Sequence, residues 1–488
     1  MRRGWILETR RLRRVSRIIR AEPEPFRLDV FPDPATVVPS MAAKSRLRVS
    51  SSTALILALL FGFAGCTTPG SRKSPPATAI IIPPLTQAPA RPEAILPVML
   101  GIDVLERDGF AAIRGKRIGL LTHAAGVNRR GESTINVLRH APELKLVALF
   151  APEHGLYGTE EAGKNLPDTV DRRTGLPVSS LHGRTRKPTR EMLKGLDALV
   201  IDLQDIGVRS YTFSSAMLYA MEACFQNKVE VVVLDRPNPL GGLTVDGPPM
   251  DANLMSYVGA FQVPYVHGLT IGELARMAAA VPGALAVPES VRLKGRLTIV
   301  PMRGWRRSMR WPDTGLSFVP TSPFVQDFPG CVGYAMTGLG CEIGGFSHGV
   351  SRSRLFIAYK GRTSEQLQRE LNALRLPGLA FTTTATSDAA NKPAAGVSIT
   401  VTDWAAWRPT DLSFQMMRLA CKWNNRNPFA SAPANKIAMF NKLVGSQAWW
   451  NALSSDGSRV DVKGFLADWH RRAEAYQSDV RRYWLYPE

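Results

Sequence analysis

Four near-continuous runs of apolar residues lie in the first half of the chain. They are 116–122 (KRIGLLT), 145–151 (KLVALFA), 198–203 (ALVIDL) and 229–235 (VEVVVLD). Strands with one face in water alternate apolar and polar residues, whereas unbroken apolar runs of this length are typical of parallel strands that helices cover on both faces. The pattern therefore predicts four parallel strands in the core of one sheet.

Segments with helical periodicity separate these runs. They are 132–140, 188–196 with Pro188 at its start, and 213–228. Strands that alternate with helices predict a doubly wound α/β layer with right-handed crossovers, in which ligands bind at the carboxyl ends of the strands.

The second half of the chain has a different pattern. Residues 354–360 and 396–403 read as strands, and four segments read as amphipathic helices: 364–374, 411–423, 436–453 and 465–486. This predicts a smaller α+β domain. Trp423, Trp449 and Trp450 lie in the helical pattern, and we expect them in the core rather than on a sugar-stacking surface.

Each of the four predicted strands is followed by a polar or glycine-rich loop. Because loops after parallel strands converge on one edge of the sheet, we expect their side chains to share a cleft. These side chains are Glu153, His154, Asp202, Gln204, Asp205, Arg209, Tyr211, Asp235, Arg236 and Asn238. Any one acidic residue at a strand end is more often a helix cap, but four such loops favour a site.

Several kinds of chemistry are disfavoured by missing motifs. No G-x-G-x-x-G follows the first strand, and the chain has no Walker A lysine motif, G-x-S-x-G elbow or zinc spacing. Asp202, Asp205 and Asp235 could hold Mg²⁺, but Arg209 and Arg236 could equally neutralise them. We therefore expect no cofactor and no metal, and a set of hydrogen-bonding side chains suited to a polar substrate such as a sugar.

Glu153 stands out among the acidic residues. It lies between Pro152 and His154, directly after an apolar strand, so we expect it to be partly desolvated. Desolvation raises the pKa of a carboxyl, and a raised pKa suits a proton donor.

The first 97 residues differ from the rest. Residues 1–40 are basic and Pro-rich, without periodicity, and are interpreted as a spurious or disordered extension. Residues 41–66 combine a basic start, a short apolar stretch and small residues before Cys66, which resembles a bacterial lipoprotein signal; an ordinary secretory signal or a short membrane anchor is the alternative. Residues 67–97 read as a Pro-rich linker. Since Thr67 rather than aspartate follows Cys66, we expect a lipid-anchored periplasmic protein at the outer membrane.

The net charge is +20, and residues 1–66, with 12 basic and 5 acidic side chains, account for +7 of it. The remaining charge of about +13 fits a polyanionic partner, such as nucleic acid, anionic lipid or acidic glycan. Nucleic acid is the least favoured of the three, because the globular part has no block of basic residues interleaved with aromatics. Of the later cysteines, Cys224 and Cys421 lie in apolar helical patterns and are expected to be free buried thiols. Cys331 and Cys341 are close enough in sequence to pair in an oxidising periplasm.

Longer motifs give a resemblance. The stretches GLLTHAAGVNRRGESTINVL, LVALFAPEHGLYGTEEAG, LVIDLQDIGVRSYTF, VVVLDRPNPLGG and VPYVHGLTIGELARM resemble the NamZ-type exo-β-N-acetylmuramidases, over about residues 98–488. The resemblance implies a Rossmann-like α/β domain (98–310), a smaller α+β domain (311–488), and release of terminal N-acetylmuramic acid from peptidoglycan fragments in the cleft between them.

The family motifs assign roles to residues of this chain. E-H-G matches Glu153, D-x-Q-D matches Asp202 to Asp205, and R-x-Y-T matches Arg209 and Tyr211. For such a reaction we expect Glu153 to act as the acid, Asp202 and Asp205 to orient water or the acetamide, and Arg209 to face the lactyl carboxylate. The family's H-G motif adds His267 to the expected substrate-binding set. We also include His123 and Glu342, which lie at positions where the chain departs from the family motifs.

This chain departs from the family pattern at three places. T-N-x-T-G is replaced by 122–126 (THAAG), P-S-P-N-M-P by 321–326 (TSPFVQ), and E-G-T-N with G-R-G-T by 342–345 and 347–350. The α/β half of the expected cleft is retained and the facing half is altered. Two hypotheses follow: a lipid-anchored exo-glycosidase, or a catalytically inactive muropeptide- or partner-binding lipoprotein of the same fold.

Overall fold

The structure, a computed structural model, describes residues 98–340, 343–348, 355–387 and 393–488. The leader, Cys66, the Pro-rich linker, Cys341 and Glu342 lie outside the described residues. Residues Leu96–Glu488 belong to one compact unit, and the predicted division between residues 310 and 311 stays a prediction.

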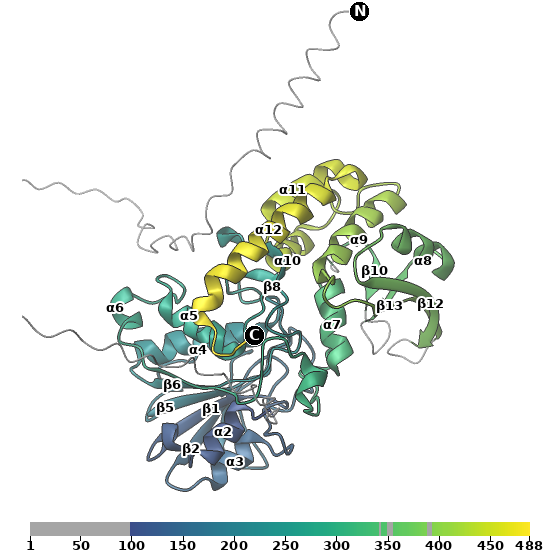
Figure 1. The fold of residues 1–488 in the computed structure, drawn as a ribbon. Helices are drawn as coiled ribbons and strands as arrows, with labels where there is room; N and C mark the ends of the chain where they lie inside the picture. The colour runs from purple at the N-terminus through teal and green to yellow at the C-terminus, as the bar shows by residue number, and fades with distance from the viewer. Residues whose placement is uncertain (1–97, 341–342, 349–354, 388–392) are drawn as a thin grey trace, which may run out of the picture. The chain divides into compact units, whose positions relative to one another are not determined.

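A seven-stranded sheet forms the centre of the first half (Figure 1). Its strands are β1 (Arg117–Thr122), β2 (Lys145–Ala151), β3 (Thr169–Val170), β4 (Pro177–Ser180), β5 (Ala198–Asp202), β6 (Glu230–Leu234) and β9 (Leu297–Val300). The order is β3-β4-β2-β1-β5-β6-β9, and every pair is parallel except β3 with β4. The four predicted strands are confirmed as its centre, and the predicted α/β class is confirmed with them.

The order of the strands reverses between β1 and β5. From β1 the chain proceeds outward through β2, and it then returns to place β5 on the other side of β1. At such a switch point the loops after the two strands separate, which leaves room for a ligand at their carboxyl ends.

Helices cover both faces of this sheet, as the unbroken apolar runs predict. They are α2 (Gly101–Arg107), α3 (Thr134–His140), α4 (Thr212–Gln226), α5 (Ile271–Ala280) and the short α6 (Glu289–Arg292). Consecutive residues of β1 point to opposite faces: Leu120 packs in the cluster that contains α2 and α3, and Leu121 in the cluster that contains α4 and α5. Figure 1 shows the two pairs of helices on the two sides of the strands.

The helix predicted at 188–196 is wrong. This segment forms turns, with Leu193 N donating to Thr189 O as in a single helical turn. Gly195 then adopts a φ of +78°, a left-handed conformation that ends a helix. The other two predicted helices are confirmed as α3 and α4.

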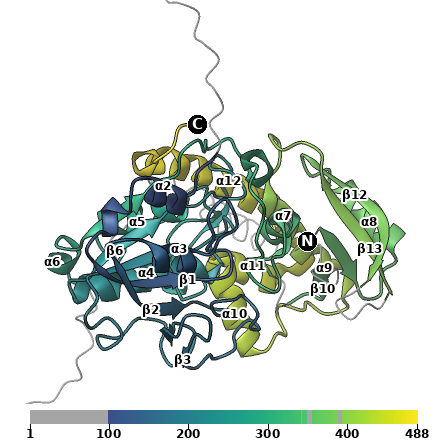
Figure 2. The same ribbon diagram turned by 90° about the horizontal axis from the view of Figure 1, so that it is seen from below.

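The second half is α+β, as predicted. A hairpin of β7 (Asp246–Pro249) and β8 (Pro264–Val266) precedes it in the chain. Its antiparallel sheet has the order β10-β11-β13-β12, with strands β10 (Phe346–His348), β11 (Phe356–Tyr359), β12 (Leu379–Ser387) and β13 (Pro393–Val401). Its helices are α7 (Phe328–Thr337), α8 (Ser364–Ala373), α9 (Pro409–Trp423), α10 (Ala434–Val444), α11 (Gln447–Asp456) and α12 (Val462–Val480). Figure 2 shows α8 beside β12 and β13.

One long helix predicted at 436–453 is two helices. Gly445 takes a φ of +78° after α10, and the side chain of Ser446 then caps α11 by accepting from Trp449 N. The predicted core role of the tryptophans is confirmed: Trp449 is fully buried, and Trp423 and Trp450 pack partly buried against the same core.

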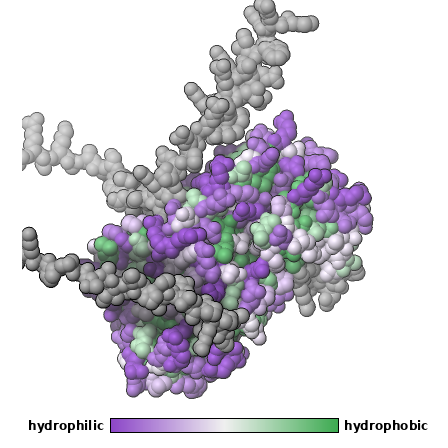
Figure 3. Space-filling model, in the orientation of Figure 1, coloured by the Kyte–Doolittle hydropathy of each residue, from purple (hydrophilic) through white to green (hydrophobic). Residues whose placement is uncertain are grey.

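The thiols of Cys224 and Cys421 are buried and free, as predicted, and burial raises the pKa of both. Within the described ranges, no helix combines the length and the apolar composition needed to cross a membrane. The face seen in Figure 3 is mostly hydrophilic, with apolar residues in separate patches.

Candidate functional site

Two neighbouring strands bring Glu153 and His182 together. Ala151 at the end of β2 pairs with Ser180 at the end of β4. Each functional side chain lies two residues beyond its strand, so both leave the sheet at the same edge. His182 Nε2 lies 3.4 Å from Glu153 Oε1, and both residues are buried.

The carboxylate of Glu153 is held by two neutral donors. Gly163 N donates to Oε1 and Thr212 Oγ1 to Oε2, each at 2.7 Å. Burial raises the pKa of Glu153, but these hydrogen bonds, with His182 and His154, lower it by more, so the pKa lies below its ordinary value of 4.5. The expected raised pKa of Glu153 is therefore wrong, because the residues next to Glu153 in the sequence do not indicate the two donors, Gly163 and Thr212. Glu153 is ionised at neutral pH.

His154 is fixed by the tight loop around it. Its φ is +70°, a left-handed conformation that is uncommon for a residue with a side chain. Nδ1 lies 2.7 Å from Glu160 O, and because a carbonyl only accepts, Nδ1 carries the proton and Nε2 is left as an acceptor in the neutral ring. The Pro-x-His-Gly sequence thus aims an imidazole beside Glu153.

The switch point between β1 and β5 holds a second pair of polar side chains. Gln204 N donates to His123 Nε2 at 3.0 Å, so the proton of neutral His123 is on Nδ1. Burial and the charge of Arg236 hold the pKa of His123 well below 6.5. His123 Nδ1 and Gln204 Oε1 are buried and have no hydrogen-bond partner among the described residues.

Asp205 and His267 form a third pair. Asp205 Oδ2 accepts from Gly207 N at 2.8 Å and lies 3.4 Å from His267 Nε2, while Leu269 N donates to His267 Nδ1. In the part of the chain that is described, Asp205 Oδ1 is buried with no hydrogen bond. This carboxylate therefore has one oxygen available for a ligand.

Both carboxylate oxygens of Asp202 already accept hydrogen bonds from the protein. Arg236 donates to both of its carboxylate oxygens, through Nε and Nη2, and Thr134 Oγ1 donates to Oδ2. Both members of the ion pair are buried. The geometry thus gives Asp202 and Arg236 a structural role, and the interpretation that arginine neutralises this carboxylate is confirmed.

Asp235 and Asn238 also hold the fold. Asp235 accepts from Arg236 N, Thr270 Oγ1, Gly272 N and the hydroxyl of Tyr486, which fixes the start of α5 and the end of the chain. Burial raises its pKa to about 6. Asn238 caps its own turn by accepting from Leu240 N and donates to Leu269 O. These contacts leave neither side chain directed at a substrate.

The expectation that Arg209 faces a substrate carboxylate is wrong. Its guanidinium is buried and donates to four backbone carbonyls, those of Pro248, Val263, Leu443 and Val444. The last two are at the end of α10, whose carbonyls have no helical partners. Arg209 therefore ties the loop after β5 to that helix end.

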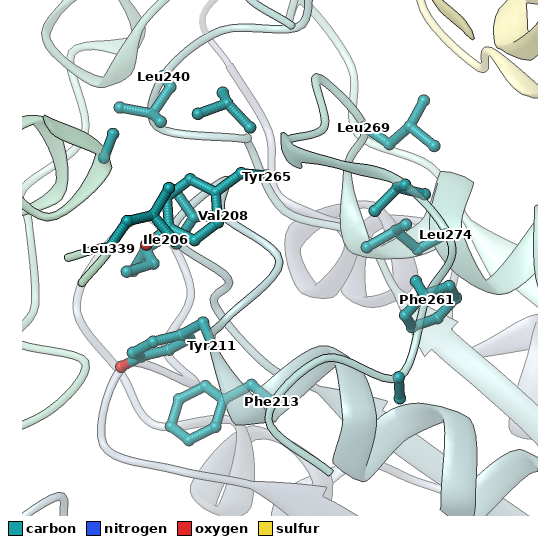
Figure 4. Packing of buried hydrophobic residues seen from close by; sticks show 14 of the residues in the cluster. Ile206, Val208, Tyr211, Phe213, Leu240, Phe261, Tyr265, Leu269, Leu274 and Leu339 are labelled. Atoms are coloured by element: carbon teal, nitrogen blue, oxygen red, sulfur yellow. The ribbon is translucent and has the colours of Figure 1, made fainter. Parts of the chain in front are cut away.

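Tyr211 is buried in the core at the end of the same loop. Its hydroxyl donates to Thr321 Oγ1 at 2.8 Å, and its ring packs edge-on against Phe213. Figure 4 shows this pair near Ile206 and Val208 of the loop. Burial raises the pKa of Tyr211.

Sequence reasoning missed His182, Thr212 and Tyr257. The strand before His182, β4, has only four residues and ends in two serines, so it gave no apolar run. The ring of Tyr257 lies 6.0 Å from that of His182. The basic loop sequence HGRTRK after β4 was the available signal.

One group of side chains has the composition of a metal site, away from these residues. Ligand atoms of Asp246, Asp411 and His470 lie within 4.8 Å of one another. His470 Nε2 and Asp411 Oδ1 are 2.9 Å apart, the distance of a charge-assisted hydrogen bond. The suggested Mg²⁺ ligands Asp202 and Asp235 are instead committed to separate protein donors.

Comparisons with known proteins agree on one family. Residues 118–329 match the family model for the N-terminal part of exo-beta-N-acetylmuramidase NamZ, and residues 332–486 match the model for its C-terminal part. The peptidoglycan beta-N-acetylmuramidase NamZ of Bacillus subtilis (strain 168) is 42% identical over 286 residues, which cover 58% of this chain and 67% of the relative.

Two solved structures have the same fold. A DUF1343 family protein from Bacteroides fragilis NCTC 9343 is 36% identical, with a TM-score of 0.71 over 80% of this chain and 99% of that chain. A second DUF1343 family protein from the same organism is 22% identical, with a TM-score of 0.60 over 80% of this chain and 100% of that chain, and this likeness concerns the fold alone.

Proposed function

The chain belongs to the exo-beta-N-acetylmuramidase NamZ family, and we propose on that premise that it is an exo-acting glycoside hydrolase of peptidoglycan fragments. It releases terminal N-acetylmuramic acid or a related amino sugar. The relative from Bacillus subtilis carries this class of activity in its name. The inactive binding protein, the second hypothesis from the sequence, gains no support from these comparisons.

The observation that carries the proposal is a concentration of unsatisfied polar atoms around Glu153 and the switch point. In the described ranges, buried atoms without a hydrogen bond include His123 Nδ1, both ring nitrogens of His182, Gln204 Oε1, Asp205 Oδ1 and His267 Nε2. Each such atom costs about 1–3 kcal/mol, so folded proteins satisfy nearly all of them. A sugar, with hydroxyl and acetamide groups, supplies matching donors and acceptors.

Glu153 is the reacting carboxylate in this proposal. The hydrogen bonds from Thr212 and Gly163 lower the pKa of Glu153 despite its burial, which disfavours it as a proton donor. As an ionised group it takes the proton from the attacking water or orients the acetamide of the substrate. The expected acid role is thereby replaced by that of a base.

Asp205 is the second carboxylate of the proposed reaction. Hydrolysis breaks the bond between the anomeric carbon and the leaving oxygen, so that oxygen must receive a proton while water adds to the carbon. Asp205 Oδ1 is buried and has no hydrogen-bond partner in the described chain, so this oxygen is available to accept a hydrogen bond from the attacking water or from the acetamide of the substrate. Asp202 acts only through Arg236, as a positioning residue.

The location of the enzyme is part of the proposal. The basic and apolar segment before Cys66 supports a lipid anchor on that residue and a periplasmic position at the outer membrane. Metabolic labelling with a palmitate analogue tests the anchor, since a Cys66→Ala variant should lose the label that the wild type carries.

The activity is tested with two chromogenic substrates, a β-N-acetylmuramide and a β-N-acetylglucosaminide with the same leaving group. Wild type should cleave the muramide, and Glu153→Gln should lower kcat by about 100-fold or more while substrate binding persists. Glu161→Gln is the matched control, because Glu161 is an exposed glutamate in the same loop. Near-normal turnover by Glu153→Gln refutes the assignment, and a wild type that binds muramyl sugars without cleaving them favours the binding protein.

A further inference from the structure

Arg186 lies in the loop that follows β4, four residues beyond His182. Its guanidinium lies over the ring of Tyr257, 5.0 Å from the ring centre. Nη1 of Arg186 is buried and has no hydrogen-bond partner within the described residues. Nor does any carboxylate of those residues form an ion pair with this arginine, so its charge is not neutralised by the described chain.

The platform under Arg186 joins it to the candidate site. Tyr257 donates its hydroxyl to Leu181 O at 3.4 Å, and its ring lies 5.4 Å from that of Tyr219 and 6.0 Å from that of His182. Burial lowers the pKa of His182, and the nearby positive charge of Arg186 lowers it further, whereas the negative charge of Glu153 raises it. The net pKa of His182 lies below its ordinary value. Arg186 is therefore held on the same side as the Glu153 and His182 pair.

Three buried arginines of the described chain give a comparison for Arg186, which is itself only partly buried. Arg236 pairs with Asp202 and Arg307 pairs with Glu273. Arg209 donates through Nη1 and Nη2 to backbone carbonyls and leaves only its Nε without a hydrogen bond among the described residues. A buried N–H group that lacks a partner costs free energy, and the cost is larger for a charged group. Arg186 differs from all three, because neither a carboxylate nor a carbonyl of the described residues meets its buried Nη1, and this points to an anionic group that comes from outside the chain.

We propose that Arg186 binds the lactyl carboxylate of the terminal N-acetylmuramic acid and thereby selects muramides over glucosaminides. This inference rests on the proposed function. The two sugars differ by the lactyl ether, whose carboxylate fits the two parallel N–H groups of a guanidinium. A sugar without that carboxylate leaves the buried N–H unpaired, and sites built for a polar partner reject analogues that lack it.

The test compares kcat/KM on the two chromogenic substrates in wild type and Arg186→Met. We expect a loss of about 100-fold for the muramide, as is typical for a charged hydrogen-bonded contact, and less than about 3-fold for the glucosaminide. Arg186→Lys should recover part of the muramide rate, since lysine keeps the positive charge but lacks the two parallel N–H donors of a guanidinium. Arg184→Met is the matched control, because Arg184 lies in the same loop with a side chain that is 91% exposed.

Calorimetric binding of the free sugars separates this inference from the proposed function. We expect wild type to bind N-acetylmuramic acid more tightly than its methyl ester or N-acetylglucosamine, and Arg186→Met to bind all three alike. That result supports the inference even if the wild type hydrolyses neither substrate. Equal losses for both chromogenic substrates, an unchanged preference in Arg186→Met, or a wild type that does not distinguish the free sugars overturns it.

Discussion

Asp202 and Glu153 follow the same sequence pattern, an apolar strand that ends in an acidic residue, yet the fold treats them differently. Asp202 receives hydrogen bonds from Arg236 and Thr134, and its charge is neutralised. Glu153 receives two hydrogen bonds from neutral groups and faces His182, an imidazole without a hydrogen-bond partner in the described chain. A strand-end position thus brings both carboxylates to the same edge of the sheet, and their partners decide which one keeps a charge that is not neutralised by arginine.

Removing the charge of Asp202 should have the largest effect on stability. Asp202→Asn leaves Arg236 buried with an unpaired charge, and breaking a buried pair in this way costs about 3–5 kcal/mol. Urea unfolding followed by circular dichroism measures this. Asp479→Asn, at an exposed position of α12, should stay within about 0.5 kcal/mol of wild type. An Asp202→Asn protein with normal stability and no activity would give Asp202 a catalytic role.

The sequence could predict the sheet because its strands are buried on both faces and therefore read as apolar runs. It could also predict which loops lie at one edge, since that follows from parallel pairing. It could not predict partners that come from far along the chain. Asp202 meets Arg236 after 34 residues, and Arg209 meets Val444 after 235 residues.

The errors at the site have the same origin. The pKa of Glu153 depends on Thr212, the first residue of α4, which lies 59 residues further along the chain. No local sequence pattern indicates that contact. His182 and Arg186 were missed because β4 is short and its loop was not recognised as one that follows a strand. Local sequence thus indicates where side chains emerge, and the tertiary structure determines which of them have partners.

The variants Arg209→Met and Arg186→Met should differ in their effects on stability and on substrate preference. The variant removes the donors from the carbonyls of Leu443 and Val444 at the end of α10, and we expect a loss of about 2 kcal/mol in the free energy of unfolding. The ratio of muramide to glucosaminide cleavage should stay at the wild-type value, whereas Arg186→Met changes that ratio. A changed ratio in folded Arg209→Met would restore this residue to the substrate-binding set.

The pH profile tests whether Glu153 reacts as an anion. Its folded pKa is lowered, so the carboxylate is present at neutral pH and is lost only as the pH falls through a value below 4.5. Below that pKa, kcat/KM should fall by about tenfold per pH unit, and the limb should be absent from the residual activity of Glu153→Gln. Circular dichroism at each pH guards against acid unfolding. A rate that instead rises steadily from pH 7 toward pH 5 through this group would make Glu153 the proton donor.

The smallest expected effect concerns His470, whose Nε2, unlike the ring nitrogens of His182, already has a carboxylate hydrogen-bond partner in the described chain. Its Nε2 lies 2.9 Å from Asp411 Oδ1 of α9 and 3.5 Å from Asp246 Oδ1 of β7. The hydrogen bond and charge of Asp411, with the charge of Asp246, raise the pKa of His470, while burial and Arg408 oppose them. Asp246 is itself crowded by Asp411, and the two carboxylates favour an imidazolium between them.

The sign of the resulting pH dependence follows from this raised pKa. The stabilisation from His470 is fully present below the ordinary pKa of 6.5 and is lost as the pH rises through the higher folded value. We therefore expect His470→Gln to be less stable than wild type by about 1 kcal/mol at pH 6, the scale of a partly exposed ion pair, and to match it at alkaline pH. His140→Gln, an exposed histidine on α3, should behave as wild type throughout. A stability gap between His470→Gln and wild type that stays constant with pH would mean that the histidine contributes packing rather than charge.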